Sequence, residues 1–131
     1  MLIGILLLAS CASSRLHQQG LDEFDKGRYE SGLQKLEQAA SSDPDNLSYK
    51  LDLKGRHDEA VQKLIAEGDK ARAGGDASAA ESAYKRVLVI ESGNSRAARG
   101  IQGIEADRHH AQIVAQAAQE FEGGNDEQAY A

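Results

Sequence analysis

The 131-residue sequence has no tryptophan, two phenylalanines, four tyrosines, one proline and one cysteine. A single cysteine excludes an internal disulfide, so the fold must be held together by packing alone. Alanine is abundant and large β-branched residues are scarce, a mixture typical of helices that meet through small side chains. The formal net charge is −6 and no basic stripe is visible, which argues against a nucleic-acid partner. The composition therefore favours one small all-α domain.

The N-terminal end carries an apolar run, Leu2 to Leu8, broken only by Gly4. Seven residues are too few to cross a hydrocarbon core, which needs roughly twenty, but they suffice for the apolar part of a secretory signal. No lysine or arginine precedes the run, so we expect the true start to lie a few codons upstream. The alternative is a buried apolar strand or helix that contains an incidental cysteine.

The segment Leu8-Ala9-Ser10-Cys11 resembles the lipobox of bacterial lipoproteins. The resemblance implies that residues 1–10 are a signal peptide, that Cys11 is lipidated, and that residues 11–15 form the lipidated N-terminus and a linker. Ala12 follows the cysteine where an aspartate would favour the inner membrane. We therefore expect the chain to be anchored at the periplasmic face of the outer membrane.

An internal repeat of 48 to 49 residues runs through the rest of the chain, residues 16–131. Each copy has a small residue, then a turn, then a second small residue five positions past the central glycine of the turn. The turns are Lys26-Gly27-Arg28, Gly74-Gly75-Asp76 and Gly123-Gly124-Asn125. The small residues are Gly20 and Gly32, Gly68 and Ala80, and Ala117 and Ala129. In the first two copies Leu36 also aligns with Tyr84.

The first copy resembles a tetratricopeptide repeat in Gly20, Phe24, Gly27, Tyr29, Gly32, Leu36, Ala39 and Pro44. The resemblance implies hairpins of two helices whose small residues meet, so that Gly32 lies against Gly20 and Ala80 against Gly68. Tetratricopeptide units are 34 residues long, and the extra residues here recur in each copy. We therefore expect an array of helical hairpins with elongated first helices. The third copy stops just inside its second helix, and we expect the sequence to be the front part of a longer protein.

Helix signals support this interpretation. Asn46 can cap a long helix that begins at Leu47, and Asn94 takes the same place in the next copy. Short second helices are predicted over residues 29–40 and 78–90, with Ser78 and Glu81 as a capping box for the latter. Gly55 lies within the first long helix, where glycine weakens or bends it.

Residues that could carry chemistry show no convincing pattern. The histidines are His17, His57, His109 and His110, and the adjacent pair cannot easily share one metal ion on a helix. The glycine pairs lack the lysine and hydroxyl residue of a phosphate-binding loop. The carboxylate clusters fit solvated helix faces better than the paired acids of a hydrolase. We therefore expect no enzyme activity, no metal and no cofactor.

The whole chain resembles the leading part of lipidated outer-membrane secretins of the general secretion pathway D class and their type IV pilus relatives. The residues that carry this resemblance are 15–17, 45–50, 58–61, 86–90, 93–97 and 107–111. In that family the helical region is periplasmic and precedes the ring-forming modules and the pore. The resemblance implies a role in type II secretion, protein transport or pilus assembly.

These observations predict a protein–protein interaction module that binds protein or peptide partners through stacked hairpins. The full-length protein could form a homo-oligomeric ring. An alternative is a free-standing repeat lipoprotein that acts as an adaptor in envelope assembly. A weaker alternative is the regulatory arm of a cell-wall enzyme.

Overall fold

The protein is an all-α structure. The computed structural model describes the backbone of residues 3–122 and the side chains of residues 12–122, and within them it contains helices and no strand. The helices are α1 (Ile3–Asp25), α2 (Tyr29–Ser42), α3 (Leu47–Ala73), α4 (Ala77–Ile90) and α5 (Ser95–Glu122). The expectation of an all-helical chain is confirmed.

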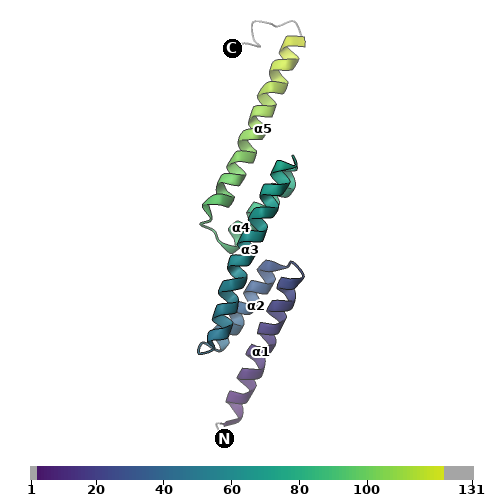
Figure 1. The fold of residues 1–131 in the computed structure, drawn as a ribbon. Helices are drawn as coiled ribbons and strands as arrows, with labels where there is room; N and C mark the ends of the chain where they lie inside the picture. Colours follow the sequence, from purple (N-terminus) through teal and green to yellow (C-terminus); the bar gives the residue numbers. More distant parts are fainter. Residues whose placement is uncertain (1–2, 123–131) are drawn as a thin grey trace.

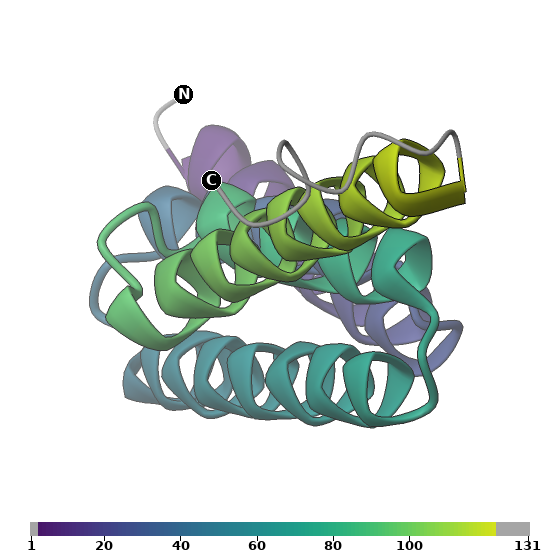
Figure 2. The ribbon, with the colours of Figure 1, turned by 90° about the horizontal axis from the view of Figure 1, so that it is seen from above.

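The helices run up and down along one long axis, and their lengths alternate (Figure 1). The short helices α2 and α4 have 14 residues each, whereas α3 has 27 and α5 has 28. α1 packs mainly on α2 and α3 on α4, while α2 also meets α3 and α4 meets α5. Seen from above, α3 lies on one side of the molecule and α5 on the other (Figure 2). The elongated helices that the sequence predicted are thus α3 and α5.

The two turns that join α1 to α2 and α3 to α4 have the same geometry 48 residues apart. Gly27 and Gly75 adopt positive φ angles of 77° and 80°, which glycine reaches without the steric penalty of a Cβ. The amide of Arg28 donates to the carbonyl of Glu23 at 3.1 Å, and the amide of Asp76 donates to that of Ala71 at 2.9 Å. Equivalent residues in the sequence therefore build equivalent backbone turns.

The capping residues of the long helices are as predicted. Asn46 accepts a hydrogen bond from the amide of Tyr49 at 3.4 Å, and Asn94 accepts one from the amide of Ala97 at 3.0 Å. The predicted capping box of Ser78 and Glu81 is wrong, because α4 begins at Ala77 and its cap is Asp76. The Asp76 carboxylate accepts from the amide of Ala79 at 2.9 Å. The turn was predicted to include Asp76, but it ends at Gly75, so Asp76 takes the capping position of α4.

Apolar side chains gather in two clusters that lie along the stack. One joins α3, α4 and α5 and is centred on Tyr84, with Leu64, Val87 and Ile104 buried around it. The other joins α1, α2 and α3 through Phe24, Leu33 and Ala60. Because each cluster takes residues from three helices, each hairpin depends on the next one for part of its core.

Candidate functional site: an apolar groove between α2, α3 and the end of α4

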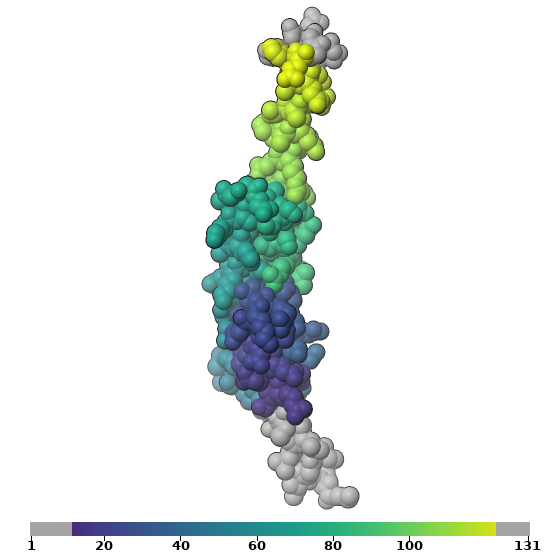
Figure 3. Space-filling view, turned by 90° about the vertical axis from the view of Figure 1, so that its right-hand side faces the viewer, coloured from purple at the N-terminus to yellow at the C-terminus, as the bar shows by residue number. Residues whose placement is uncertain are grey.

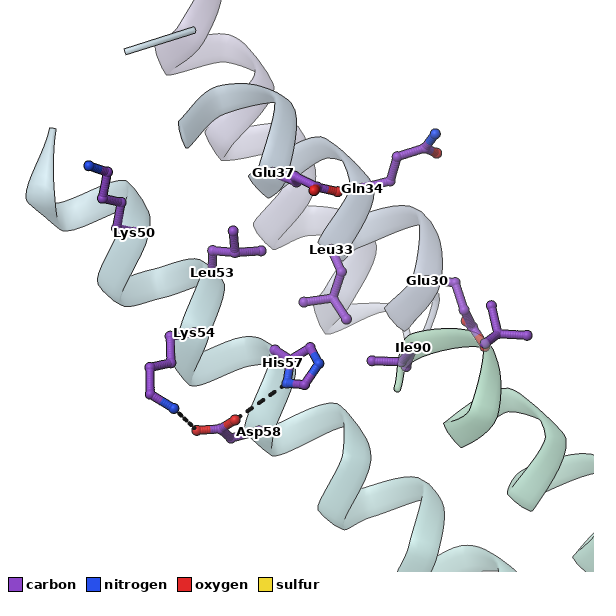
Figure 4. Close-up of a pocket in the computed structure, with 11 residues that line it drawn as sticks. Glu30, Leu33, Gln34, Glu37, Lys50, Leu53, Lys54, His57, Asp58 and Ile90 are labelled. Atoms are coloured by element: carbon purple, nitrogen blue, oxygen red, sulfur yellow. Dashed lines mark hydrogen bonds and ion pairs between the residues drawn. The ribbon is translucent and has the colours of Figure 1, made fainter. Parts of the chain in front are cut away.

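A groove of about 600 Å³ lies where α2, α3 and the C-terminal end of α4 meet (Figure 4). Leu33 and Leu53 face one another across it, and Ile90 closes one end (Figure 4). Leu33 belongs to the buried cluster that contains Phe24 and Ala60, and Leu53 and Ile90 pack against this cluster, so the floor of the groove is continuous with the core. The other residues that line the groove are Glu30, Gln34, Glu37, Lys50, Lys54, His57, Asp58 and Val89.

The local sequence explains why each wall has an apolar centre and polar edges. On α2, the lining residues Glu30, Leu33, Gln34 and Glu37 follow the i, i+3, i+4, i+7 spacing of one helix face. On α3 the same spacing brings Lys50, Leu53, Lys54 and His57 together. Each wall thus presents one leucine between longer polar side chains.

The charged residues of the α2 wall are acids, whereas the α3 wall carries two lysines and one acid, Asp58. Within the described residues Glu37 and Lys50 form no hydrogen bond or ion pair. Lys54 is bound instead to Asp58, with 2.8 Å between Nζ and Oδ2, and His57 Nδ1 lies 3.3 Å from Oδ1 of the same carboxylate. The hydrogen bond from Lys54 lowers the pKa of Asp58 below its usual range. A bound segment could therefore form ion pairs with Glu37 on one side and Lys50 on the other.

Glu30 at the mouth of the groove is held by Arg86 of α4. The guanidinium donates to both carboxylate oxygens at 2.7 and 2.9 Å, and to the carbonyl of Gly27 at 3.2 Å. The hydrogen bond from Arg86 lowers the pKa of Glu30. Bidentate pairs of this kind are the stronger and better oriented ones. Arg86 therefore fixes the end of α4 against the start of α2 and sets the shape of the groove.

The small residues predicted as repeat positions lie at helix contacts outside the groove. A Cβ added to Gly32 would lie 2.8 Å from the carbonyl oxygen of Gly20, so these two residues do meet. A Cβ on Gly68 would lie 2.5 Å from the ring of Tyr84, and Ala80 is fully buried. The structure thus places both pairs in the interior of their hairpins.

The remaining predicted positions fall at the ends of the chain. Ala117 is half-buried on α5. The backbone of Cys11 belongs to α1, but its side chain lies outside the described residues, as does the whole of Ala129. The predicted lipid attachment and the predicted third pair, Ala117 with Ala129, stay predictions.

Sequence reasoning missed the residues that form the groove. Leu33, Leu53 and Ile90 were not singled out, although the helical spacing of Glu30, Leu33 and Glu37 was a usable signal. It named Tyr84 only as the counterpart of Leu36 and did not predict that the ring lies between Gly68 of α3 and Gly100 of α5. No neighbouring residue of Gly68 or Gly100 in the sequence indicates that both glycines pack against the same ring.

The histidines lie in separate places. His17 stacks on Tyr49, with 4.5 Å between the ring centres, and its Nε2 lies 2.8 Å from Asp52 Oδ2. His57 lines the groove, and His109 and His110 are exposed on α5. In the part of the chain that the structure describes, no three metal-ligating side chains come together. No helix there is long and apolar enough to span a membrane.

No protein-family model, curated protein sequence or solved structure matches this chain. A functional proposal must therefore rest on the chain's own residues and geometry. The groove offers an apolar floor and a charged rim, which are features that can receive a side chain of another protein.

Proposed function

We propose that the chain is a non-enzymatic protein–protein interaction module built from tetratricopeptide-like helical hairpins. The observation that carries this proposal is the recurrence, 48 residues apart, of the same glycine turn and of the same glycine contact, since a Cβ on Gly20 would meet Leu36 as a Cβ on Gly68 would meet Tyr84. Hairpins that stack in this way build extended surfaces suited to binding other chains. The groove between α2, α3 and α4 is the contact surface.

The module acts at the outer membrane, where lipid on Cys11 holds it at the periplasmic face. The lipobox-like segment Leu8-Ala9-Ser10-Cys11 supports the anchor, and two or more acyl chains would make it firm. The resemblance to the leading part of lipidated secretins supports a role in protein secretion or pilus assembly. This part of the secretion or pilus apparatus would bind segments of partner proteins and would catalyse no reaction.

Replacement of Cys11 by alanine tests the anchor. The variant should move from the membrane fraction to the soluble periplasmic fraction and should no longer incorporate a labelled fatty acid. Ser14→Ala, three residues away, is the matched control and should stay with the membrane. Persistent membrane association of Cys11→Ala would refute lipid anchoring.

Photo-crosslinking in cells tests the groove. A photoreactive amino acid at Leu53, inside the groove, should give a discrete cross-linked product with a partner protein. The same group at Lys70, exposed near the end of α3, is the control and should not give that product. Reversal of the free rim charges, Glu37→Lys with Lys50→Glu, should weaken the cross-link without lowering the melting temperature. Identical products from both positions would count against the groove as the contact surface.

A further inference from the structure

The two halves of α5 have different surroundings. In the first half Ala97, Gly100 and Ile104 are buried, and they pack with α3 and α4. From Glu105 to Glu122 none of the side chains is buried. This second half extends beyond the other described helices as a single helix (Figures 1 and 3). Within the described residues, only the first half of α5 therefore has a buried face.

The exposed half of α5 carries an apolar face. Ile113, Val114 and Phe121 are 51%, 54% and 59% exposed. Together with Ala117 they follow the i, i+1, i+4, i+8 spacing that places four side chains on one helix face. Large apolar side chains gathered in this way mark an interaction surface.

The preceding long helix, α3, is divided in the same way, but both of its halves are packed. In its first half Tyr49 stacks on His17 of α1. In its second half Leu64, Ile65 and Gly68 pack against α4. A long helix of this stack therefore meets the preceding hairpin with its first half and the second helix of its own hairpin with its second half.

The exposed face of α5 is in register with the surface of α3 that packs on α4. Three of its residues stand 49 positions after residues of that surface: Ile113 after Leu64, Val114 after Ile65, and Ala117 after Gly68. The ends of the two helices, Ala73 and Glu122, are separated by the same interval. The repeat therefore assigns this face to the segment that follows α5 in the same chain.

The sequence after α5 carries the signals of a second helix. The turn Gly123-Gly124-Asn125 corresponds to Gly74-Gly75-Asp76, in which Asp76 caps α4. Asparagine caps helices as well as aspartate does. Asp126 and Glu127 follow, and acidic residues are favourable in the first turn of a helix. These signals predict a helix that begins at Asp126, in the part of the chain that lies outside the described residues.

The first hairpin indicates which residues of that segment should meet α5. There Phe24 of α1 shares a buried cluster with Leu33 of α2, and Gly32 lies against Gly20. The residues that stand 97 positions later are Phe121 for Phe24, Tyr130 for Leu33, Ala117 for Gly20 and Ala129 for Gly32. A large apolar pair and a small pair thus recur at the same spacing.

We propose that residues 126–131 fold back on α5 as the start of a third hairpin, with Ala129 against Ala117 and Tyr130 against Phe121. The occupant of the face is the chain itself, as α4 is the occupant of the matching face of α3. Six helical residues rise about 9 Å, so they reach the part of the face that holds Phe121 and Ala117. The proposal rests on the hairpin repeat of the proposed interaction module, but it uses neither the groove nor the lipid anchor.

An intrachain disulfide tests the small pair. In the 131-residue chain with Cys11→Ser, Ala117→Cys combined with Ala129→Cys should form this bond on mild oxidation, because the two Cβ atoms would lie about 4 Å apart. Ala118→Cys with Ala129→Cys is the matched control, since Ala118 is exposed on another side of α5. Mass spectrometry and non-reducing electrophoresis should show at least tenfold faster bond formation in the first pair. Equal rates, or disulfides between two molecules in place of intrachain ones, overturn the proposal.

Nuclear Overhauser contacts between labelled aromatic rings test the large pair in a chain whose residues 126–131 are unchanged. The rings of Phe24 and Tyr29, whose centres are 4.8 Å apart, supply an internal reference within the first hairpin. A cross-peak between Phe121 and Tyr130 is expected, and it should disappear in Phe121→Leu. If the reference cross-peak is present and the Phe121–Tyr130 one is absent, the third hairpin is refuted while the hairpin stack stands. If both are absent, the hairpin stack of the proposed function is refuted as well.

Discussion

Tyr84 allows a sharp test of how closely α3, α4 and α5 pack. Its ring lies between two glycines, and a Cβ would stand 2.5 Å from ring carbons at both Gly68 and Gly100. Its hydroxyl donates to Asp69 at 2.7 Å, which restricts any movement of the ring. At Gly55, on the same helix as Gly68, a Cβ would meet nothing within 4 Å. The same substitution at these two positions of α3 should therefore have opposite effects.

The magnitudes follow from two opposing contributions. Glycine to alanine within a helix stabilises the folded state by about 0.5–1 kcal/mol, and Gly55→Ala should gain this amount in full. At Gly68 the added methyl group must displace the Tyr84 ring, and overpacking of a core costs about 1–3 kcal/mol. Gly68→Ala should therefore lower the free energy of unfolding by up to about 2.5 kcal/mol, and by about 1 kcal/mol at the middle of both ranges, after the gain is subtracted.

Thermal unfolding followed by far-ultraviolet circular dichroism measures both variants. For a chain of this size each kcal/mol shifts the melting temperature by roughly 3–5 °C. The melting temperature of Gly55→Ala should therefore lie measurably above that of the unsubstituted protein, and that of Gly68→Ala measurably below it. A double-mutant cycle supplies the control, since the cost of Gly68→Ala should largely disappear in a Tyr84→Ala background. If Gly68→Ala melts as high as Gly55→Ala, the ring does not lie where the packing argument places it.

Three further substitutions test other contacts. Gly75→Ala should lower the free energy of unfolding by about 1 kcal/mol, because its φ of 80° disfavours a Cβ; an unchanged urea midpoint would contradict this. Glu30→Gln should lower the free energy of unfolding by about 1 kcal/mol at neutral pH. This figure is kept small because the ion pair of Glu30 with Arg86 is partly exposed to solvent, which screens it. Because the pKa of Glu30 is lowered in the folded protein, that stabilisation is complete above the ordinary glutamate pKa of about 4.3. It is lost as the pH falls below that value, so urea titrations of the two proteins should converge in acid and diverge at neutral pH. Ala80→Trp should force α3 and α4 apart and clearly lower the melting temperature, since Ala80 is fully buried; unchanged melting would rule out the hairpin packing.

Much of the hairpin geometry could be predicted from local sequence. Asn46 marks the start of α3 because a side-chain oxygen must satisfy the free amides of its first turn. Gly27 and Gly75 mark the turns because few other residues tolerate a positive φ. The error at Ser78 has a local cause, since Asp76 and Ser78 can both cap a helix and only the preceding turn decides between them. The predicted pairing of Gly20 with Gly32 is confirmed.

The groove and the Tyr84 contact could not be predicted in the same way. Arg86 reaches Glu30 across 56 residues of sequence, and neither residue carries a local sign of the other. The two clusters of the core each draw on three helices, so the environment of a side chain depends on how successive hairpins are rotated against one another.

The sequence by itself determined where α3 and α5 begin and where the glycine turns lie, because caps and turn glycines act within one or two turns of the backbone. Only the tertiary structure decided which faces of the helices are buried, which form the groove and which are exposed on α5. That choice depends on packing between residues far apart in the chain, where interlocking side chains fix one arrangement.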